Sequence, residues 1–133
     1  MSQETMNVVR RALDAYNRRD LTIYDELYTP GYEWFPALMG AVDGASFVGR
    51  EGVARYYEVV GDTWEEFSVA GEEFRDLGDS VLARIRVEGR GKGSGVPVVG
   101  HQTLLCDFHD GKISRVRSYL DHGEALQAAG LRD

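Results

Sequence analysis

The stretch SVLARIRVEGRGKGSGVPVVGHQTLLCDFHDGKISRVRSYLDHG, residues 80–123, decides the fold because it predicts three consecutive strands. Polar and apolar residues alternate through residues 81–90, as in a half-buried strand. A glycine-rich link then leads into a second strand over residues 96–108. Asp110-Gly111 is a hairpin signal before a third strand over residues 112–121. The segment therefore predicts an antiparallel meander.

The alternation gives the first of these strands two chemically different faces. One face carries Leu82, Arg84, Arg86, Glu88 and Arg90, and the other carries Val81, Ala83, Ile85 and Val87. On the third strand the same parity places Ile113, Arg115, Arg117, Tyr119 and Asp121 together. We expect the charged faces to meet in a pocket. The apolar face would then need cover, which predicts a homodimer.

Length and composition limit the class of protein. The chain has 133 residues and 43% apolar residues, so residues 1–133 suit one domain with a substantial core. A net charge of −7 argues against nucleic acid and anionic membranes as partners. No apolar run approaches the roughly 18 residues of a membrane span. Cys106 has no partner for an internal disulfide, and the N-terminus carries no signal-peptide pattern, so a cytoplasmic location is expected.

The rest of the chain predicts helices before and after the sheet. Apolar spacing indicates a helix carrying Met6 to Tyr16, a short second helix capped by Asp20, and a third over residues 50–64. Residues 32–35 suggest a short aromatic strand, residues 40–49 a loop able to act as a lid, and residues 66–77 a further strand. A last helix over residues 124–129 ends at Gly130. The predicted class is α+β: a strongly curved antiparallel sheet with three N-terminal helices and a short C-terminal helix.

Four stretches carry a resemblance to a known superfamily. They are AYNRRDLTIYDELYTPGYEWF, FVGREGVARYY, GKGSGVPV and DGKISRVRSYLDHGEALQAAGL. Together they resemble the nuclear transport factor 2 superfamily, and within it SnoaL-like and ketosteroid-isomerase-like proteins. The resemblance implies a cone-shaped fold (a cystatin-like roll), and homodimers are common in the superfamily. It leaves function open, because this scaffold carries isomerases, cyclases, hydrolases and non-catalytic binding modules.

The catalytic residues of these relatives carry over only in part. The ketosteroid isomerases have a catalytic aspartate before a proline, where this chain has Phe35 before Pro36, and their oxyanion tyrosine would fall near Ala12. Asp121 resembles the terminal aspartate base of SnoaL-like cyclases. The limonene epoxide hydrolases are similar in two further places. Their Arg-x-Asp resembles Arg86-Val87-Glu88, and their Tyr-x-Asn resembles Tyr32-Glu33-Trp34, with tryptophan in place of the asparagine.

The predicted site combines these residues. When an arginine bridges two carboxyl groups, one can stay protonated and act as an acid while the other is ionised and acts as a base. Asp121, Glu88 and Arg86 are therefore the candidate catalytic groups, with His101 as a proton carrier. The candidate ligand-binding residues are Tyr32, Trp34, Thr103, Tyr119 and Arg117. The histidines lack metal-ligand spacing, so neither a metal nor a cofactor is expected.

Each candidate residue could also have a purely structural role. Arg86 and Glu88 suit a solvated cross-strand pair, Asp121 suits a helix cap, and His101 suits a structural hydrogen bond. The aromatic residues suit core packing. The sequence therefore predicts a protein that binds a small apolar cyclic metabolite. It is either an acid–base enzyme of the cyclase, isomerase or epoxide hydrolase type, or a non-catalytic ligand-binding or dimerisation module.

Overall fold

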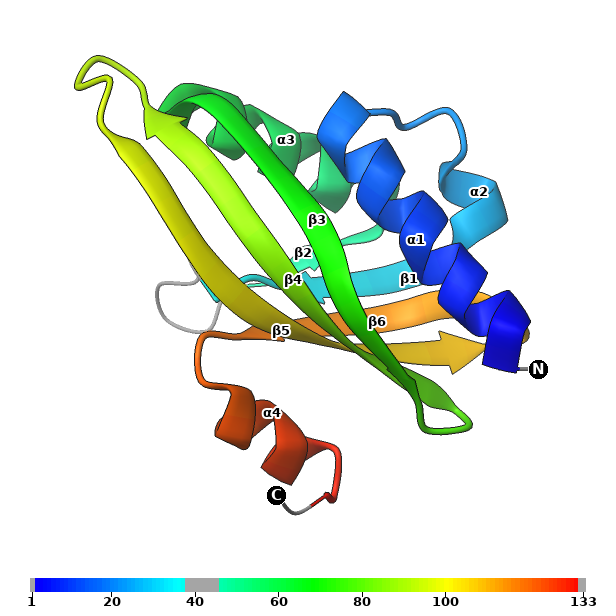
Figure 1. Ribbon diagram of the computed structural model, residues 1–133. Helices are drawn as coiled ribbons and strands as arrows, with labels where there is room; N and C mark the ends of the chain where they lie inside the picture. The colour runs from blue at the N-terminus through cyan, green and yellow to red at the C-terminus, as the bar shows by residue number, and fades with distance from the viewer. Residues whose placement is uncertain (1, 38–45, 132–133) are drawn as a thin grey trace.

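The computed structural model describes residues 2–37 and 46–131, which form four helices and six strands (Figure 1). In chain order these are α1 (Ser2–Arg18), α2 (Tyr24–Leu27), β1 (Tyr28–Phe35), β2 (Phe47–Val48), α3 (Gly49–Thr63), β3 (Trp64–Asp76), β4 (Ser80–Gly91), β5 (Pro97–His109), β6 (Lys112–Tyr119) and α4 (His122–Ala128). In the described part of the chain, no helix is both long and apolar enough to cross a membrane.

All six strands belong to one sheet in the order β2-β1-β6-β5-β4-β3. Every neighbouring pair is antiparallel except β1 and β6, which run parallel. The predicted α+β cone is confirmed, but the sheet is mixed, because β1 comes from the opposite end of the chain and joins β6 in the same direction. Register shifts within β1, β3 and β5–β6 help the sheet to bend.

Most predicted elements lie within two or three residues of the observed ones, since their hairpin and helix-end signals are strong. β1 begins four residues before the predicted strand, and β2 was not predicted. Asp20 does not cap α2: its carboxylate accepts hydrogen bonds from the backbone and hydroxyl of Thr22. Most of the loop predicted over residues 40–49, and with it the proposed lid, lies outside the described residues.

The inner face of the sheet is apolar and covered by α1, α2 and α3 (Figure 1). It carries Val81, Ala83, Ile85 and Val87, which are at most 5% exposed. The premise that this face needs a partner chain was therefore wrong, because the helices of the same chain bury it. α4 packs on the outer face, over Leu82 and Leu105.

A bulge in the β5–β6 pairing changes which β6 residues share a face. Asp107 pairs with Arg115 and the next residue, Phe108, pairs with Ile113, so Ser114 is the extra residue. Ile113 consequently lies in the inner core, whereas Arg115 and Arg117 lie on the outer face. The predicted common face of Ile113 and Arg117 was wrong for this reason.

Side chains from α1 and the turn after it protect the free edge of β3. The Asn17 amide donates to the carbonyl of Val69 and accepts from the Val69 N–H, both at 2.8 Å. Arg19 donates to the carbonyl of Phe67 at 3.2 Å. These bonds satisfy backbone groups that another strand could otherwise pair with.

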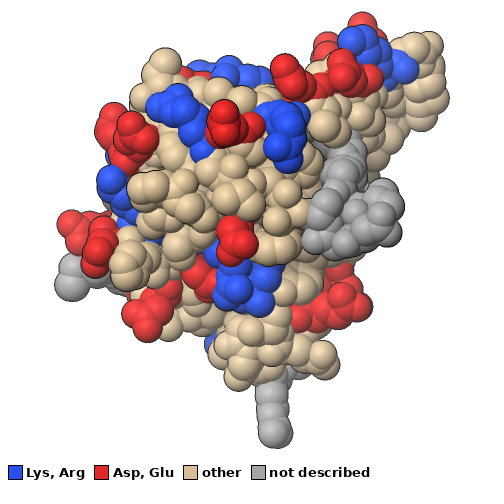
Figure 2. All heavy atoms as spheres, turned by 180° about the vertical axis from the view of Figure 1, so that it is seen from behind, with Lys and Arg blue, Asp and Glu red and all other residues tan. Residues whose placement is uncertain are grey.

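Charged side chains of both signs are interspersed over the surface turned away from the viewer of Figure 1. Figure 2 shows this face, where red and blue residues alternate around an uncharged area. No single-sign field of the kind that steers nucleic acids or membranes is visible there.

Candidate ligand-binding site

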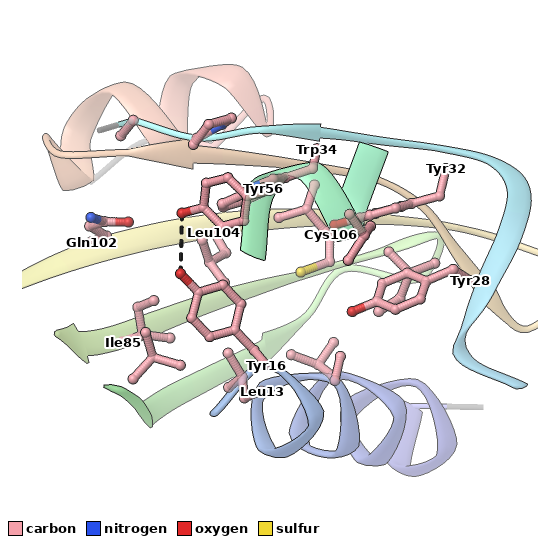
Figure 3. A pocket seen from close by; sticks show the side chains of 18 of the residues that line it. Leu13, Tyr16, Tyr28, Tyr32, Trp34, Tyr56, Ile85, Gln102, Leu104 and Cys106 are labelled. Carbon is pink, nitrogen blue, oxygen red and sulfur yellow. Dashed lines mark hydrogen bonds between the residues drawn. The ribbon is translucent and has the colours of Figure 1, made fainter. Parts of the chain in front are cut away.

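A cavity lies between the inner face of the sheet and the helices (Figure 3). Its volume is about 80 Å³, several times the roughly 10–15 Å³ that one bound water needs by the same kind of measure. Most lining side chains are apolar or aromatic. They are Val9, Ala12, Leu13, Tyr16, Tyr28, Tyr32, Trp34, Pro36, Ala37, Val53, Tyr56, Tyr57, Trp64, Phe67, Val69, Ile85, Gln102, Leu104, Cys106, Ile113 and Val116.

Two tyrosine hydroxyls form the main polar feature of the cavity. Tyr16 of α1 and Tyr56 of α3 lie 3.1 Å apart, oxygen to oxygen, so that one hydroxyl donates to the other (Figure 3). Each helix presents its tyrosine because the residue belongs to the stripe that faces the sheet. The hydroxyl that accepts keeps its own proton for a further acceptor.

Burial determines the protonation state of this pair. Burial raises the pKa of Tyr16 well above its usual value, and the neighbouring Tyr56 raises it further. Burial also raises the pKa of Tyr56, although the Tyr16 hydroxyl and the Trp34 indole partly offset it. Both phenols are therefore neutral hydrogen-bond donors at physiological pH and poor bases.

Trp34 adds a donor that lies near the Tyr56 hydroxyl, close enough to lower the pKa of Tyr56, but not in hydrogen-bonding geometry. Its indole Nε1 is buried and makes no hydrogen bond of normal geometry, although the indole packs edge-on against Tyr56 with ring centroids 5.5 Å apart. A buried N–H without an acceptor is costly and rare in native proteins. The Trp34 N–H is therefore a buried donor of the cavity lining that a ligand oxygen could satisfy.

Gln102 of β5 provides the remaining polar group near the same end. Its Oε1 accepts a hydrogen bond of 2.7 Å from the Ser118 hydroxyl, which fixes the side-chain amide. Figure 3 places Gln102, Tyr16 and Tyr56 toward one end of the cavity and Tyr28 toward the other. Burial raises the pKa of Tyr28, as it does for Tyr32.

The thiol of Cys106 lies in the wall between these ends. The residue is 1% exposed, and burial raises its pKa to about 12, with the Asp107 carboxylate adding to the shift. The thiol is thus neutral and unreactive, unlike the thiolates of catalytic cysteines. Among the described lining residues there is no carboxylate, histidine, lysine or arginine, and no cluster of metal-binding side chains occurs in the described chain.

The structure separates the predicted site residues into two groups. Tyr32 and Trp34 line the cavity. The other seven lie on the outer face of the sheet or beyond its last strand: Arg86, Glu88, His101, Thr103, Arg117, Tyr119 and Asp121. None of these seven lines the cavity. Their predicted roles remain predictions, but in this arrangement they would not act on a molecule held between sheet and helices.

Three of the predicted catalytic residues are neighbours on the outer face. Arg86 pairs across the strands with His101, and its Nε donates to the Glu88 carboxylate at 2.9 Å. His101 Nε2 lies 3.1 Å from a carboxylate oxygen of Glu72. These side chains are 40–57% exposed. Solvated pairs of this kind contribute little to stability.

The other outer residues have structural partners. Asp121 caps α4 by accepting hydrogen bonds from the N–H groups of Gly123 and Glu124. The hydroxyl of buried Thr103 lies 2.9 Å from Nδ1 of His122. Tyr119 packs beside the cluster under α4, and Arg117 lies 3.5 Å from the Asp107 carboxylate.

Sequence reasoning missed Tyr16, Tyr56, Gln102 and Cys106 as site residues. Both tyrosines stand in apolar helical stripes, which predicted core packing alone. The usable signal was a hydroxyl inside an otherwise apolar stripe on each of two helices. Gln102 alternates with Leu104 and Cys106 on the inner face of β5, where one polar residue in an apolar row marks a wall of the site.

Taken together, the fold and the cavity define a cone-shaped α+β domain of the small-molecule-binding kind. Residues 9–116 match the SnoaL-like domain family. The chain belongs to this family. Comparison with curated proteins gives no match.

Solved structures share the fold at low sequence identity. A SnoaL-like polyketide cyclase described as putative, from Jannaschia sp. CCS1, has a TM-score of 0.76 and 20% identity, covering 96% of this chain and 92% of the other. TerC co-crystallised with polyporic acid has a TM-score of 0.77 and 19% identity, with coverage of 96% and 98%. A hypothetical protein with a ketosteroid isomerase-like fold from Catenulispora acidiphila DSM 44928, in complex with trimethylamine, has a TM-score of 0.72 and 19% identity, with coverage of 93% and 92%.

Proposed function

We propose that this protein binds a small, neutral, mostly apolar molecule that carries an oxygen acceptor such as a ketone. The observation that carries the proposal is the buried Trp34 N–H, which lacks an acceptor inside an apolar cavity beside the Tyr16–Tyr56 pair. An acceptor oxygen there would satisfy a group that otherwise remains unpaired.

The balance of donors and acceptors supports an acceptor-bearing ligand. The Trp34 indole can only donate, and the tyrosine pair keeps one hydroxyl proton for another partner. The oxygen of Gln102 is already engaged by Ser118, which leaves its NH₂ group as a donor. No described lining residue carries a positive charge, so a neutral ligand suits the cavity better than an anion.

Apolar contacts would supply most of the affinity. Toward its far end the cavity is lined mostly by aromatic and hydrocarbon surface, with the Tyr28 hydroxyl as a polar group. We therefore propose that a ring or alkyl group occupies that end and that the acceptor lies near the phenols. The complex of TerC with polyporic acid shows that a protein of this fold was crystallised with an organic ligand.

Acid–base catalysis is the second candidate, of the cyclase, isomerase or epoxide hydrolase type. Its support is the outer-face juxtaposition of Arg86, Glu88 and His101, and the name of the similar cyclase. The described cavity has neutral phenols able to polarise a carbonyl but no base to take a proton.

If any epoxide or cyclic ketone is turned over, the variant Asp121→Asn distinguishes a catalytic role of Asp121 from a helix-capping one. Loss of turnover would support catalysis, and full activity would leave Asp121 as a helix cap.

The binding proposal is tested with acetophenone and ethylbenzene, which have similar shapes and differ in the carbonyl oxygen. Both tryptophans of the chain line the cavity, so their fluorescence reports binding directly. We expect acetophenone to bind about tenfold more tightly, because one hydrogen bond to a buried donor is worth roughly 1–1.5 kcal/mol. Trp34→Phe, which removes the indole N–H and keeps Trp64 as the fluorescent reporter, should lose most of this preference. The double variant Tyr16→Phe, Tyr56→Phe should lose part of it.

Tyr119→Phe is the matched control, since it removes a phenol hydroxyl from the outer face. It should bind both probes as the original protein does. Equal affinity of acetophenone and ethylbenzene for the unmodified protein would contradict the proposal of an acceptor-bearing ligand. Absence of binding by both would contradict the cavity as a binding site.

We also propose a homodimer in the cytoplasm. Because the inner face of β4 from Val81 to Val87 is buried, we propose that the outer face around Val99, which is 56% exposed, meets the second copy. Light scattering at micromolar concentration should give twice the mass of 14.8 kDa, and a monomer mass would rule the dimer out. A fluorescent fusion should appear in the cytoplasm of its host.

A further inference from the structure

The inner face of the sheet continues beyond the cavity along the β4–β5 hairpin. Ile85 and Gln102 pair across the two strands and both line the cavity. Directly paired residues point to the same face, so the next inner residues of β5 are Gly100, opposite Val87, and then Val98, opposite Gly89. Gly100 and Val98 therefore continue the inner face of β5 beyond Gln102, the last residue of that strand to line the cavity on this side.

This extension is apolar and open. Val98 is 42% exposed, and Val96, which precedes β5, is 56% exposed. The pairing of β6 with β5 stops at Thr103, opposite Tyr119. Among the described strands, none pairs with β5 beside Gly100 or Val98 on that side. The exposed strip is therefore available to a molecule that emerges from the cavity.

Glycine within a strand weakens it and marks a bulge, a bend or a close approach by another group. Three glycines of β3 and β4 are explained by close approach within the protein. A Cβ at Gly71 would lie 2.5 Å from Phe74, one at Gly89 2.9 Å from Phe67, and one at Gly91 2.5 Å from Ser94. In β1, Gly31 falls within a register irregularity.

Gly100 has none of these explanations. A Cβ there would meet no atom within 4 Å, and the residue does not adopt a positive φ. The β4–β5 register runs through it without a shift. The described protein therefore leaves open the space that a side chain would fill, directly beside the cavity wall at Gln102.

We infer that the ligand is an elongated apolar molecule that extends out of the cavity over Gly100 and Val98. Its acceptor group lies at the level of Tyr16 and Tyr56, and an alkyl or aryl extension occupies the space above Gly100. This inference rests on the proposed binding function and adds the shape of the ligand to it. Gly100 would then be a residue that determines specificity, because any side chain at this position shortens the site.

Phenyl n-alkyl ketones of increasing length test the inference: acetophenone, butyrophenone, hexanophenone and octanophenone, titrated by tryptophan fluorescence. A buried methylene contributes about 0.8 kcal/mol, or roughly fourfold in affinity, so we expect a gain of about two- to fourfold per methylene. In Gly100→Leu, acetophenone should bind within about twofold of the original affinity. Octanophenone should bind at least about tenfold more weakly than it does to the original protein.

Gly61→Leu is the matched control, because it adds the same side chain at an exposed glycine of α3 where a Cβ would also meet no atom within 4 Å, away from the cavity lining. It should leave the whole series unchanged. Gly100→Leu should keep the melting temperature, since leucine fits strands better than glycine. If that variant does not fold, Gly100→Ala replaces it, with a loss of about threefold expected for octanophenone.

The outcomes separate this inference from the proposed function. Acetophenone binding without any gain along the series, or a Gly100→Leu protein that binds octanophenone as tightly as the original, would overturn the elongated ligand and leave the cavity site intact. Failure of every ketone to bind the original protein would overturn both.

Discussion

The two faces of the sheet differ in what their polar residues can do. On the inner face, a few uncharged donors lie in an apolar cavity, where an unpaired hydrogen-bonding group is costly and therefore selective for a ligand. On the outer face, Arg86, Glu88 and His101 carry more chemistry by residue type, yet water solvates them. The contrast indicates that burial, more than reactivity of the side chain, identifies the candidate site of this protein.

The largest effect should come from truncating the inner face. Ile85 is 3% exposed and lines the cavity, so Ile85→Ala should lower the free energy of unfolding by about 2–4 kcal/mol. The neighbouring outer residue gives the comparison: Arg86→Ala should change it by no more than about 0.5 kcal/mol. Urea unfolding measures both, and equal losses would contradict the assignment of the faces.

Alkaline pH should weaken the inner face next. Burial raises the pKa of Tyr57 to about 12, whereas a tyrosine in the unfolded chain titrates near 10. The unfolded state therefore loses its proton first, and stability present below about pH 10 falls as the pH rises through 12. The loss from Tyr57 alone should reach about 2–3 kcal/mol. Unfolding curves of the original protein and Tyr57→Phe, recorded over this range, check it, since the variant should show a smaller decline.

A smaller effect is expected at the boundary between the outer face and α4. Asp121→Ala removes the carboxylate that accepts from Gly123 and Glu124, and should cost about 1 kcal/mol. Asp121→Asn should cost almost nothing, because asparagine caps a helix nearly as well. Thermal melting compares the two variants. A loss of the same size in both would mean that the charge, and not the cap, stabilises this end.

The smallest effect is expected for the exposed pair His101 and Glu72. Each side chain is 42% exposed, so Glu72→Gln should alter the free energy of unfolding by no more than about 0.5 kcal/mol. Ketone binding should not change, because neither residue lines the cavity. A clear loss of binding would show that the outer cluster communicates with the cavity, and would favour the catalytic candidate.

The order of elements was predictable because its signals are local. Alternation through residues 81–90, the Asp110-Gly111 turn and the helical stripe from Met6 to Tyr16 each depend on a few neighbouring residues. Alternation shows that a strand has two different faces, but the covering helices decide which face is inside. The bulge at Ser114 changes which residues of β6 face the core. Neither glycine nor proline stands at this position, so the sequence does not indicate the bulge.

The candidate site was less predictable because it joins distant residues. Tyr16 and Tyr56 are separated by 40 residues, and nothing in either helix identifies the other as a hydrogen-bond partner. Trp34 was a predicted wall residue, but its lack of an acceptor depends on every atom around its nitrogen. The resemblance to cyclases and epoxide hydrolases predicted Arg86, Glu88 and Asp121 as site residues, but they lie on the outer face or beyond the last strand.

The parallel pairing of β1 with β6 has a consequence for how the protein is made. Tyr28 pairs with Ile113, 85 residues further along the chain, so the inner core closes only after β6 has been synthesised and has left the ribosome. Contacts between such distant residues raise the contact order, which slows folding. Until β6 is available, β1 and the aromatic side chains around it remain exposed to other chains. The interval between the emergence of β1 and the arrival of β6 is therefore the one in which this protein is most open to aggregation.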